Sequence, residues 1–284
     1  MEVNGSIYRR RIVVNRAGMA LSTAAMAGGL AGLAWILWTL FYNGLSAFDV
    51  DFFTASTPAP GSEGGGMANA IVGSLMIVGV STVVATPVGI LAGIYLAEFG
   101  DRSKFASVTR FVVDIMLSAP SIVIGLFVYA IAVATVGHFS GWAGSLALGL
   151  IAVPVVVRTT ENMLRLVPGS LREAAFALGA PRWRVNLAVT LRAVKGGVVT
   201  GVLLSIARMI GETAPLLFTA LSNQFFSADM SQPMANLPVV IYNFALSPYE
   251  DWQRLAWGGA ALIALVVLAI NIAARALFRD PETR

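Results

Sequence analysis

Residues 69–97 read NAIVGSLMIVGVSTVVATPVGILAGIYLA. The stretch contains 29 residues and no Asp, Glu, Lys or Arg. A helix of this length is about 44 Å long at about 1.5 Å per residue, whereas the hydrocarbon core of a bilayer is about 30 Å thick. We therefore predict a transmembrane helix with residues to spare for a tilt or a kink.

Five further apolar runs are long enough to cross a bilayer. They cover residues 17–42, 109–136, 144–163, 198–221 and 254–278. The sequence therefore predicts an all-α, polytopic membrane protein with six transmembrane helices. Residues 237–246 are apolar but too short to span, and we expect a short segment at the outer surface or a re-entrant segment.

The composition supports the membrane prediction. Hydrophobic residues make up 57% of the chain and charged residues 12%, about half the charged share of a soluble domain. The formal net charge of +4 lies in short segments between the apolar runs, so membrane topology explains it better than nucleic-acid binding. The chain has no cysteine and one histidine, His138, which excludes disulfides and thiolate metal sites and disfavours a histidine metal site.

The basic residues orient the spans. Seventeen of the 19 Lys and Arg residues fall in alternate connections or span ends, at 1–16, 98–110, 158–197 and 275–284. The intervening connections, 43–68, 137–143 and 222–253, carry none. By the positive-inside rule the basic segments are cytoplasmic, so we predict a cell (inner) membrane protein with both termini in the cytoplasm. The exceptions are Arg254, at the start of the last span, and Arg208, inside the fifth.

The N-terminal arginines could belong to a signal peptide. The run that follows them, 17–42, is too long for the apolar region of such a peptide. We predict an uncleaved first span.

The longest basic connection contains a helix-stop pattern. Residues 171–191 read LREAAFALGAPRWRVNLAVTL. Helix formers fill 173–178, Gly179 follows at a typical helix-ending position, and Pro181 prevents continuation, so a second helix is expected to start near Arg182. Ala174 and Ala175 give a face of small residues that could seat in a groove of another protein, although an ordinary cytoplasmic loop helix is the simpler alternative.

This segment resembles the EAA loop of the permease subunits of ABC importers. Glu173, Ala174, Ala175 and Gly179 occupy the positions of that motif, and Val189 and Arg192 depart from its Ile and Pro. The resemblance implies a type I importer permease whose coupling helix docks on a separate ATPase. The residues it implies for this contact are Glu173, Ala174, Ala175, Gly179 and Arg182.

Two lysines, Lys104 and Lys195, are the only ones in the sequence, and neither ends a Walker A motif. The chain is therefore not expected to be an enzyme or to hold a cofactor. ATP and Mg are expected on the partner ATPase. We predict a single permease domain over 1–284, with a cytoplasmic N-terminus at 1–16, a core at about 65–278 and a coupling loop at about 164–197.

Two charged residues stand inside the fifth predicted span. Arg208 lies about 15 Å from its start, near the middle of the bilayer, and Glu212 follows one helical turn later. A charge at this depth costs roughly 2.5–3.5 kcal/mol, so both side chains should face the bundle or a water-filled cavity. Either they form a structural ion pair, or they form a substrate site to which the neighbouring Thr213 could add a hydroxyl.

The chemistry of such a substrate site favours a protonated anion. A guanidinium pairs with two oxygens of an oxyanion, whereas a carboxylate repels a bare anion. A carboxylate can, however, accept a hydrogen bond from an anion that carries a proton. Phosphate is partly protonated at neutral pH and sulfate is not, so an Arg–Glu pair is compatible with phosphate and disfavours sulfate.

The surrounding sequence resembles the permeases of phosphate-import ABC transporters. Residues 206–217 read IARMIGETAPLL, and further similar stretches lie at 65–74, 87–98 and 158–161. The resemblance implies a heteromeric importer that contains this subunit, a paralogous permease, two ATPase subunits and an extracytoplasmic phosphate-binding protein. It also implies that Arg208 and Glu212 are a charged pair needed for transport.

A third polar group lies at the inner end of the fourth span. Residues 158–161 read RTTE. Arg158 is either an anchor at the membrane edge or, with Thr159, part of an exit-side substrate site. Ser118 and Ser121, in the third span, could also line a substrate path, although hydroxyls in membrane helices often bond to their own backbone.

Prolines and glycines mark places where spans can bend or approach each other. Prolines interrupt four spans, at Pro87, Pro120, Pro154 and Pro215. Glycines four residues apart permit close helix contacts at Gly28 and Gly32, Gly89 and Gly93, and Gly197 and Gly201.

Three functional hypotheses follow. The first is a permease subunit of a phosphate importer that works by alternating access. The second is an ABC permease for another oxyanion, such as sulfate or molybdate. The third is a secondary transporter that needs no ATPase, against which the EAA-like loop argues.

Overall fold

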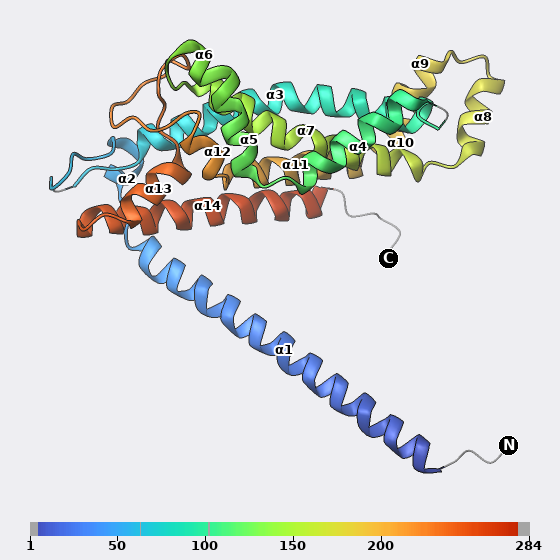
Figure 1. Ribbon diagram of the computed structural model, residues 1–284, viewed down its shortest axis with the longest axis horizontal. Helices are drawn as coiled ribbons and strands as arrows, with labels where there is room; N and C mark the ends of the chain where they lie inside the picture. The colour runs from blue at the N-terminus through green and yellow to red at the C-terminus, as the bar shows by residue number, and fades with distance from the viewer. Residues whose placement is uncertain (1–4, 63, 102, 278–284) are drawn as a thin grey trace.

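The computed structural model describes residues 5–62, 64–101 and 103–277 (Figure 1). Its α-helices are α1 (Gly5–Leu45), α2 (Val50–Thr54), α3 (Ala68–Phe99), α4 (Lys104–Ser118), α5 (Ser121–Val128), α6 (Ala134–Val136), α7 (Gly141–Arg165), α8 (Gly169–Ala177), α9 (Arg182–Arg184), α10 (Leu191–Ala193), α11 (Lys195–Ile210), α12 (Ala214–Leu217), α13 (Leu237–Ala245) and α14 (Glu250–Leu277). Two π-helical segments complete the chain, η1 (Tyr129–Val133) and η2 (Val185–Thr190).

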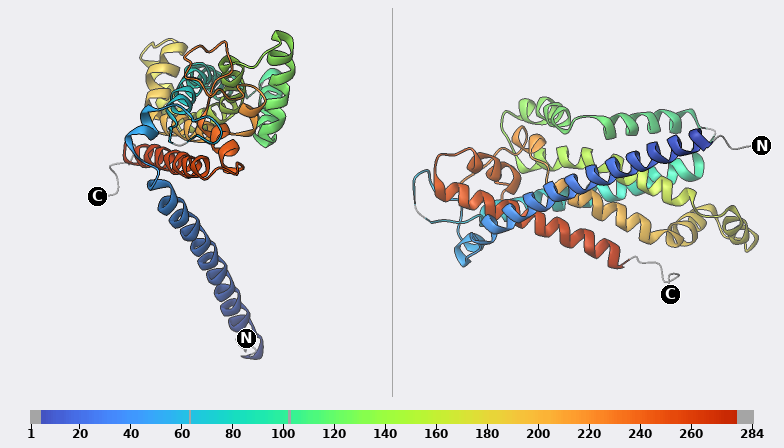
Figure 2. Two further views of the ribbon diagram at one scale, coloured as in Figure 1. Left: turned by 90° about the vertical axis from the view of Figure 1, so that its left-hand side faces the viewer. Right: turned by 90° about the horizontal axis from the view of Figure 1, so that it is seen from below.

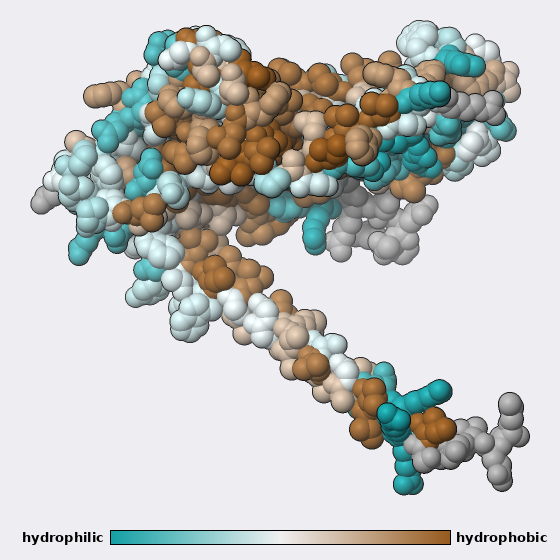
Figure 3. Space-filling model, in the orientation of Figure 1, coloured by the Kyte–Doolittle hydropathy of each residue, from teal (hydrophilic) through white to brown (hydrophobic). Residues whose placement is uncertain are grey.

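The predicted membrane fold is confirmed. By length and composition α1, α3, α7 and α14 can each cross a bilayer, and two bent pairs of helices bring the number of spans to as many as six. A broad apolar zone covers the middle of the bundle, with polar residues toward its two ends (Figure 3). This distribution is the one expected for a protein whose helices cross a hydrocarbon layer.

Helix α7 lies at the centre of the bundle. Buried residues make up 61% of its most apolar 18-residue window and none of that of α1. The largest core cluster joins α7 to α3, α11, α12 and α13 through Ile77, Leu148, Met209, Leu216 and Val239. The core therefore forms around α7, and α1 contributes little to it.

Glycines set how closely helices approach α7. A Cβ at Gly89 would lie 2.6 Å from Val156, and one at Gly93 would lie 2.6 Å from Thr160. On α11, a Cβ at Gly197 would lie 2.3 Å from Met163 and one at Gly201 2.3 Å from Thr159. Two of the three glycine pairs therefore mark the contacts by which α3 and α11 pack against α7. The third pair, Gly28 and Gly32, has no described atom within 4 Å of a Cβ position.

The third predicted span, 109–136, is interrupted at Pro120, one of the positions at which the sequence allowed a bend. The chain bends by 107° between α4 and the segment Ser121–Val136. Ala119 is extended, as the residue before a proline tends to be, and Pro120 caps α5. The prolines at 87 and 154 stand inside α3 and α7 without ending them.

The fifth predicted span, 198–221, is also interrupted, and the prediction that one helix carries both Arg208 and Glu212 is wrong. Helix α11 ends at Ile210 with Gly211 as its C-cap, and helical structure resumes only in the short α12. Pro215 stands in the first turn of α12, where its missing N–H breaks no helical bond. On the other side, Arg182–Ala193 meets α11 at a bend of 74°.

The short apolar segment that the sequence predicts is present at one end of the bundle. Helix α13 covers most of 237–246, and α2 and α13 pack with α14 around Phe52, Phe244 and Leu255. The Pro- and Gly-rich connection after α2 is largely irregular. Arg254 lies at this end, 3.9 Å from Asp49, which accounts for one exception to the charge pattern.

The basic ends of the helices gather at the opposite end of the bundle. Figures 1 and 2 both place the start of α1, the end of α14 and the α8–α9 connection toward the same end of the long axis. The alternating basic segments thus meet on one side, as predicted. Some predicted positions lie outside the described residues: the basic residues Arg102, Arg279 and Arg284, and residue 278 at the end of the last predicted span. Residues 1–4 and 63 also lie outside them.

Helix α1 leaves the bundle at an angle and contacts it through its last turns (Figure 1). A Cβ at Gly44 would lie 2.4 Å from Ala261 of α14, so the two helices touch closely there. Residues such as Leu21, Trp35 and Trp38 are exposed. The apolar face of α1 is therefore available to lipid or to another subunit.

The contact of α3 with α7 gives a first prediction. Gly93→Leu should lower the free energy of unfolding by about 1–3 kcal/mol, because the new side chain overfills the interface. Gly79→Leu on the same helix is the control, since a Cβ there has no described atom within 4 Å. Thermal stability of the purified chain in detergent measures the difference; equal stability of the two variants would contradict the packing argument.

Candidate functional site

Arg208 and Glu212 form an ion pair at the end of α11. The Arg208 Nε donates to Glu212 Oε1 at 3.3 Å. Arg208 lies in the last turn of the helix, where its charge also interacts favourably with the helix dipole. The sequence had predicted Glu212 on the same helix as Arg208, but Glu212 lies beyond the end of α11. The pair therefore marks a break in the span.

The pair lies far along α11 from the basic end of the bundle. Arg208 is 13 residues beyond Lys195, the first residue of α11, which is about 20 Å along the helix axis. Irregular backbone at membrane depth is tolerated where protein or a water-filled cavity surrounds it. The break between α11 and α12 is thus a place where a polar substrate could meet backbone and side-chain groups.

The other interrupted span, which contains α4 and α5, packs against this region. A Cβ at Gly125 of α5 would lie 2.6 Å from the Cα of Pro215 in α12. The helices that follow the two breaks therefore touch each other. Thr213 caps α12 and is half-buried, and Ser121 is the first residue of α5. The structure thus places Arg208, Glu212 and Thr213 together and Ser121 on the neighbouring helix.

The two members of the pair differ in exposure. The Arg208 side chain is 44% exposed and that of Glu212 14%. An uncovered guanidinium is costly in hydrocarbon, so this face requires water, a polar ligand or another subunit. Glu212 uses one oxygen on Arg208, which leaves Arg208 able to donate to an anion from its other nitrogens.

Arg158 and Ser118 both contact Asp114. Arg158 pairs with Asp114 and, at 3.5 Å, with Glu161. The Ser118 hydroxyl donates to the Asp114 carbonyl at 2.8 Å, and both residues line a surface hollow of about 440 Å³. Two carboxylates already engage the Arg158 guanidinium. Participation of Arg158 and Ser118 in a substrate path stays a prediction.

Thr159 lies between α7 and α11, where its methyl group faces Gly201. Gly201 precedes Arg208 by seven residues, about 10 Å along α11. Thr160, the next residue, is fully buried, and its Oγ1 has no hydrogen-bond partner among the described residues. Thr159 is thus an interhelical contact on the basic side of the candidate site.

A buried glutamate organises the basic end of the bundle. Glu161 is 2% exposed and contacts Arg110 at 2.7 Å, Arg165 at 3.0 Å and Arg158 at 3.5 Å. Arg165 also lies 3.7 Å from Asp101. These contacts join α7 to α4 and to the end of α3. Sequence reasoning missed this network, which we call the Glu161 cluster: Asp101, Arg110, Asp114, Arg158, Glu161 and Arg165.

Helical spacing was the signal that could have revealed the cluster. Arg110 and Asp114 are four residues apart, and Glu161 and Arg165 likewise. Opposite charges at this spacing lie on one face of a helix. Asp114 also falls inside the third predicted span, where an acidic residue needs a partner.

The predicted coupling helix is present as α8. Gly179 has a φ of +78°, and its N–H donates to the Phe176 carbonyl while the Ala180 N–H donates to the Ala175 carbonyl. These two bonds form a Schellman motif, which favours glycine at this position. Glu173, Ala174, Gly179 and Arg182 are exposed and Ala175 is half-buried. Contact of these residues with an ATPase stays a prediction.

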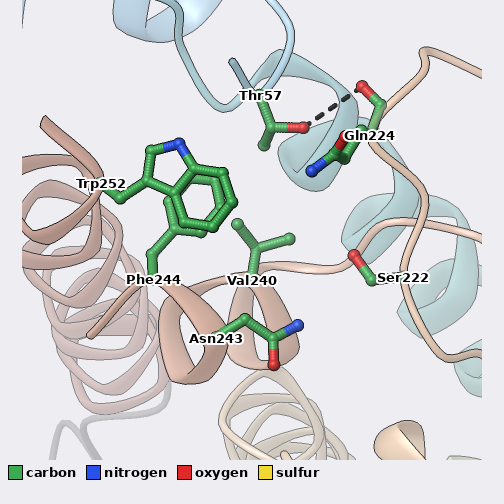
Figure 4. A pocket seen from close by; sticks show the side chains of 7 residues that line it. All are labelled: Thr57, Ser222, Gln224, Val240, Asn243, Phe244 and Trp252. Atoms are coloured by element: carbon green, nitrogen blue, oxygen red, sulfur yellow. Dashed lines mark hydrogen bonds between the residues drawn. The ribbon is translucent and has the colours of Figure 1, made fainter. Parts of the chain in front are cut away.

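A pocket of about 280 Å³ lies at the opposite end of the bundle (Figure 4). Phe244 and Trp252 stack at 4.2 Å on one side of it, and Thr57 donates to the Gln224 carbonyl at its rim. The described residues that line it are uncharged: Thr57, Ser222, Gln224, Val240, Asn243, Phe244 and Trp252. The pocket therefore lacks the guanidinium chemistry that Arg208 offers to an anion.

Comparison with known proteins decides the family. The family described as "Binding-protein-dependent transport system inner membrane component" matches residues 89–280. The chain belongs to this family. The match includes both broken spans, α8 and the Arg208–Glu212 pair.

Relatives of this family member are similar over nearly their full length. The chain is 58% identical to "Phosphate transport system permease protein PstA" of Yersinia pestis, covering 93% of this chain and 90% of the relative. The protein of the same name from Haemophilus influenzae is also 58% identical, with 94% and 95% covered. "Phosphate transport system permease protein PstA 1" of Mycobacterium tuberculosis H37Rv is 38% identical, with 97% and 90% covered.

Solved structures support the fold. An inward-facing MetNI methionine ABC transporter chain has a TM-score of 0.58 at 20% identity, with 75% of this chain and 96% of that chain covered. A chain of a bacterial ABC transporter for import of the acidic polysaccharide alginate has a TM-score of 0.59 at 15% identity, with 95% and 98% covered. The architecture of this family member is therefore that of an ABC importer permease.

Proposed function

We propose that this chain is the transmembrane permease subunit of an ATP-driven phosphate importer. The observation that carries the proposal is the near full-length similarity to phosphate permeases in a chain that also places an Arg–Glu pair at the break between α11 and α12. The similarity supplies the substrate class. The pair supplies a chemistry that fits phosphate.

The pair distinguishes phosphate from fully ionised oxyanions. Arg208 can donate two hydrogen bonds to one oxyanion in a fixed geometry. Glu212, close by and largely buried, repels an anion that has no proton to donate. Monoprotonated phosphate can donate to Glu212 while it accepts from Arg208, whereas sulfate cannot. The alternative function, a permease for sulfate or molybdate, is therefore disfavoured at this site.

The importer would require several partners. We infer a paralogous permease of the PstC type, two ATPase subunits of the PstB type that bind ATP and Mg, and an extracytoplasmic phosphate-binding protein of the PstS type. The exposed Arg208 face and the exposed α1 are surfaces that a second permease could cover. The end that carries α8 would be cytoplasmic, because the basic segments gather there, and both termini would lie on that side of the inner membrane.

Transport would proceed by alternating access. Closure of the ATPases would move α8 and its neighbours, and the site at Arg208 would open first to the outside and then to the cytoplasm. Such a cycle requires that phosphate bind with different affinity in the two states. A secondary transporter would need no ATPase, and the exposed α8 argues against it.

Co-purification and uptake together test the proposal. Tagged chain should bring down an ATPase and a second permease, and vesicles that contain the complex, the binding protein and ATP should accumulate phosphate. A tenfold excess of sulfate should leave this uptake unchanged. ATP-independent uptake would favour the secondary transporter, and inhibition by sulfate would favour a permease for another oxyanion.

A further inference from the structure

One arginine of α8 joins the coupling helix to two transmembrane helices. Arg172 Nε and Nη2 donate to the Glu98 carboxylate at the end of α3, at distances between 2.8 and 3.2 Å. Its Nη1 donates to the Val167 carbonyl at 2.7 Å, and Nη2 also donates to the Leu164 carbonyl at 2.9 Å. A single guanidinium thus binds a carboxylate of α3 and two carbonyls at and just beyond the end of α7.

The contact is largely shielded from solvent. The Glu98 side chain is 10% exposed and that of Arg172 21%. Charge-assisted hydrogen bonds to a forked guanidinium are strong and geometrically specific, and a cation is favourable at a helix C-terminus. The contact therefore holds its groups more rigidly than an exposed surface ion pair would.

A second arginine makes the reciprocal arrangement. Arg110 of α4 donates to the carbonyls of Leu96 and Gly100 at the end of α3, at 2.7 and 3.4 Å, and to Glu161 of α7. Each arginine thus caps the end of one central helix and pairs with a glutamate of the other. The ends of α3 and α7, already in contact through Gly89 and Gly93, are fastened to α4 by Arg110 and to α8 by Arg172.

The opposite end of α8 is connected differently. After Gly179 the chain passes through α9, the π-helical η2 and α10, and then bends by 74° into α11. π-helical segments are frequent at functional sites, and this one stands together with a sharp bend between α8 and α11. A displacement of α8 therefore acts directly on α3 and α7. It reaches α11, which carries Arg208, only through α9, η2 and α10.

We propose that Arg172 is the positioning residue that couples the movement of α8 to transport, by fastening it through Glu98 to the α3–α7 pair. The inference rests on the proposed function, because it presumes that an ATPase moves α8. In this arrangement α3 and α7 move together with the ATPase. The connection between α11 and α12 changes its conformation relative to them. Without the Arg172–Glu98 contact, α8 would still move with the ATPase, but its movement would not be transmitted to α3 and α7.

The test measures phosphate uptake and ATP hydrolysis on the same reconstituted, complete transporter with its binding protein. Arg172→Gln and Glu98→Gln should each lower phosphate transported per ATP hydrolysed by about tenfold, within the usual range of coupling factors. The double variant should be no worse than the single ones, because both remove the same contact. Arg172→Lys should fall between Arg172→Gln and the wild type. Arg275→Gln, at an exposed arginine in the last turn of α14, is the matched control and should keep the wild-type ratio.

The ratio of uptake to hydrolysis distinguishes a coupling role of Arg172 from a purely structural one. Uptake by the wild-type complex tests the proposed function separately. Glu98→Gln retains the carbonyl contacts of Arg172 and removes only the charge pairing with α3, so it serves as the second variant if Arg172→Gln does not assemble. A wild-type ratio of uptake to hydrolysis in assembled Glu98→Gln or Arg172→Gln would overturn the inference. Absence of ATP-driven phosphate uptake by the wild-type complex would instead overturn the proposed function.

Discussion

Replacing Arg208 by alanine is expected to abolish phosphate uptake by the assembled transporter. Each hydrogen bond to a charged group contributes about 1.5–3 kcal/mol, and the substitution removes the guanidinium that would make two of them. Uptake should therefore fall by about 100-fold or more, since about 1.4 kcal/mol corresponds to a factor of ten. Radiolabelled phosphate uptake into vesicles measures the loss, and co-purification of the partner subunits shows that assembly is intact.

Two further variants identify the chemistry at Arg208. Arg208→Lys keeps the positive charge but loses the planar pair of donors, so its uptake should lie between that of Arg208→Ala and that of the wild type. Glu212→Gln should relax the discrimination against sulfate, because the neutral amide no longer repels a fully ionised anion. Arg275→Ala, at an exposed position in the last turn of α14, is the control and should leave uptake unchanged. Normal phosphate uptake by Arg208→Ala would exclude a substrate role for this residue.

Replacing Glu161 by alanine is expected to cause the largest loss of stability. The substitution leaves three arginines without their shared carboxylate at the centre of the Glu161 cluster. Removing one partner of a buried ion pair costs about 3–5 kcal/mol, and the partial exposure of these arginines favours the lower end of that range. The thermal midpoint of the purified chain in detergent should fall markedly, together with its level in the membrane.

A matched control exists within the same cluster. Asp101 is 81% exposed and lies 3.7 Å from Arg165, so Asp101→Asn should change stability by less than about 1 kcal/mol. Equal thermal midpoints for Glu161→Ala and Asp101→Asn would show that the cluster is not a stabilising element of the fold.

Prolines illustrate where prediction from the sequence stops. Pro87, Pro120 and Pro154 all lie within long apolar runs. Helix α3 continues through Pro87 and α7 through Pro154, whereas α4 ends before Pro120. Each proline removes the same backbone donor. The surroundings differ, because α7 is buried among several helices while the segment after Pro120 packs through Gly125 against Pro215 of α12.

The candidate site was predicted in part. Arg208 and Glu212 stand out in the sequence because charges are costly inside an apolar run, and they do form a pair. Pro215 marks an interruption of this span in the sequence, but only the structure shows that the helix ends at Ile210, between Arg208 and Glu212. Arg110, Glu98 and Arg172 escaped notice because they were assigned to polar connections, where charged residues need no special explanation.

The sequence by itself determined the membrane class, the gathering of basic segments on one side and the short helix that ends at Gly179. Each of these depends on local properties: the length of an apolar run against the thickness of a bilayer, the charge of a connection, and a backbone angle that glycine adopts readily. Only the tertiary structure decided the two breaks, the Glu161 cluster and the fastening of α8 to α3 and α7. Those features join residues as far apart as the 74 positions between Glu98 and Arg172, and side chains at such separations meet only when the whole bundle has packed.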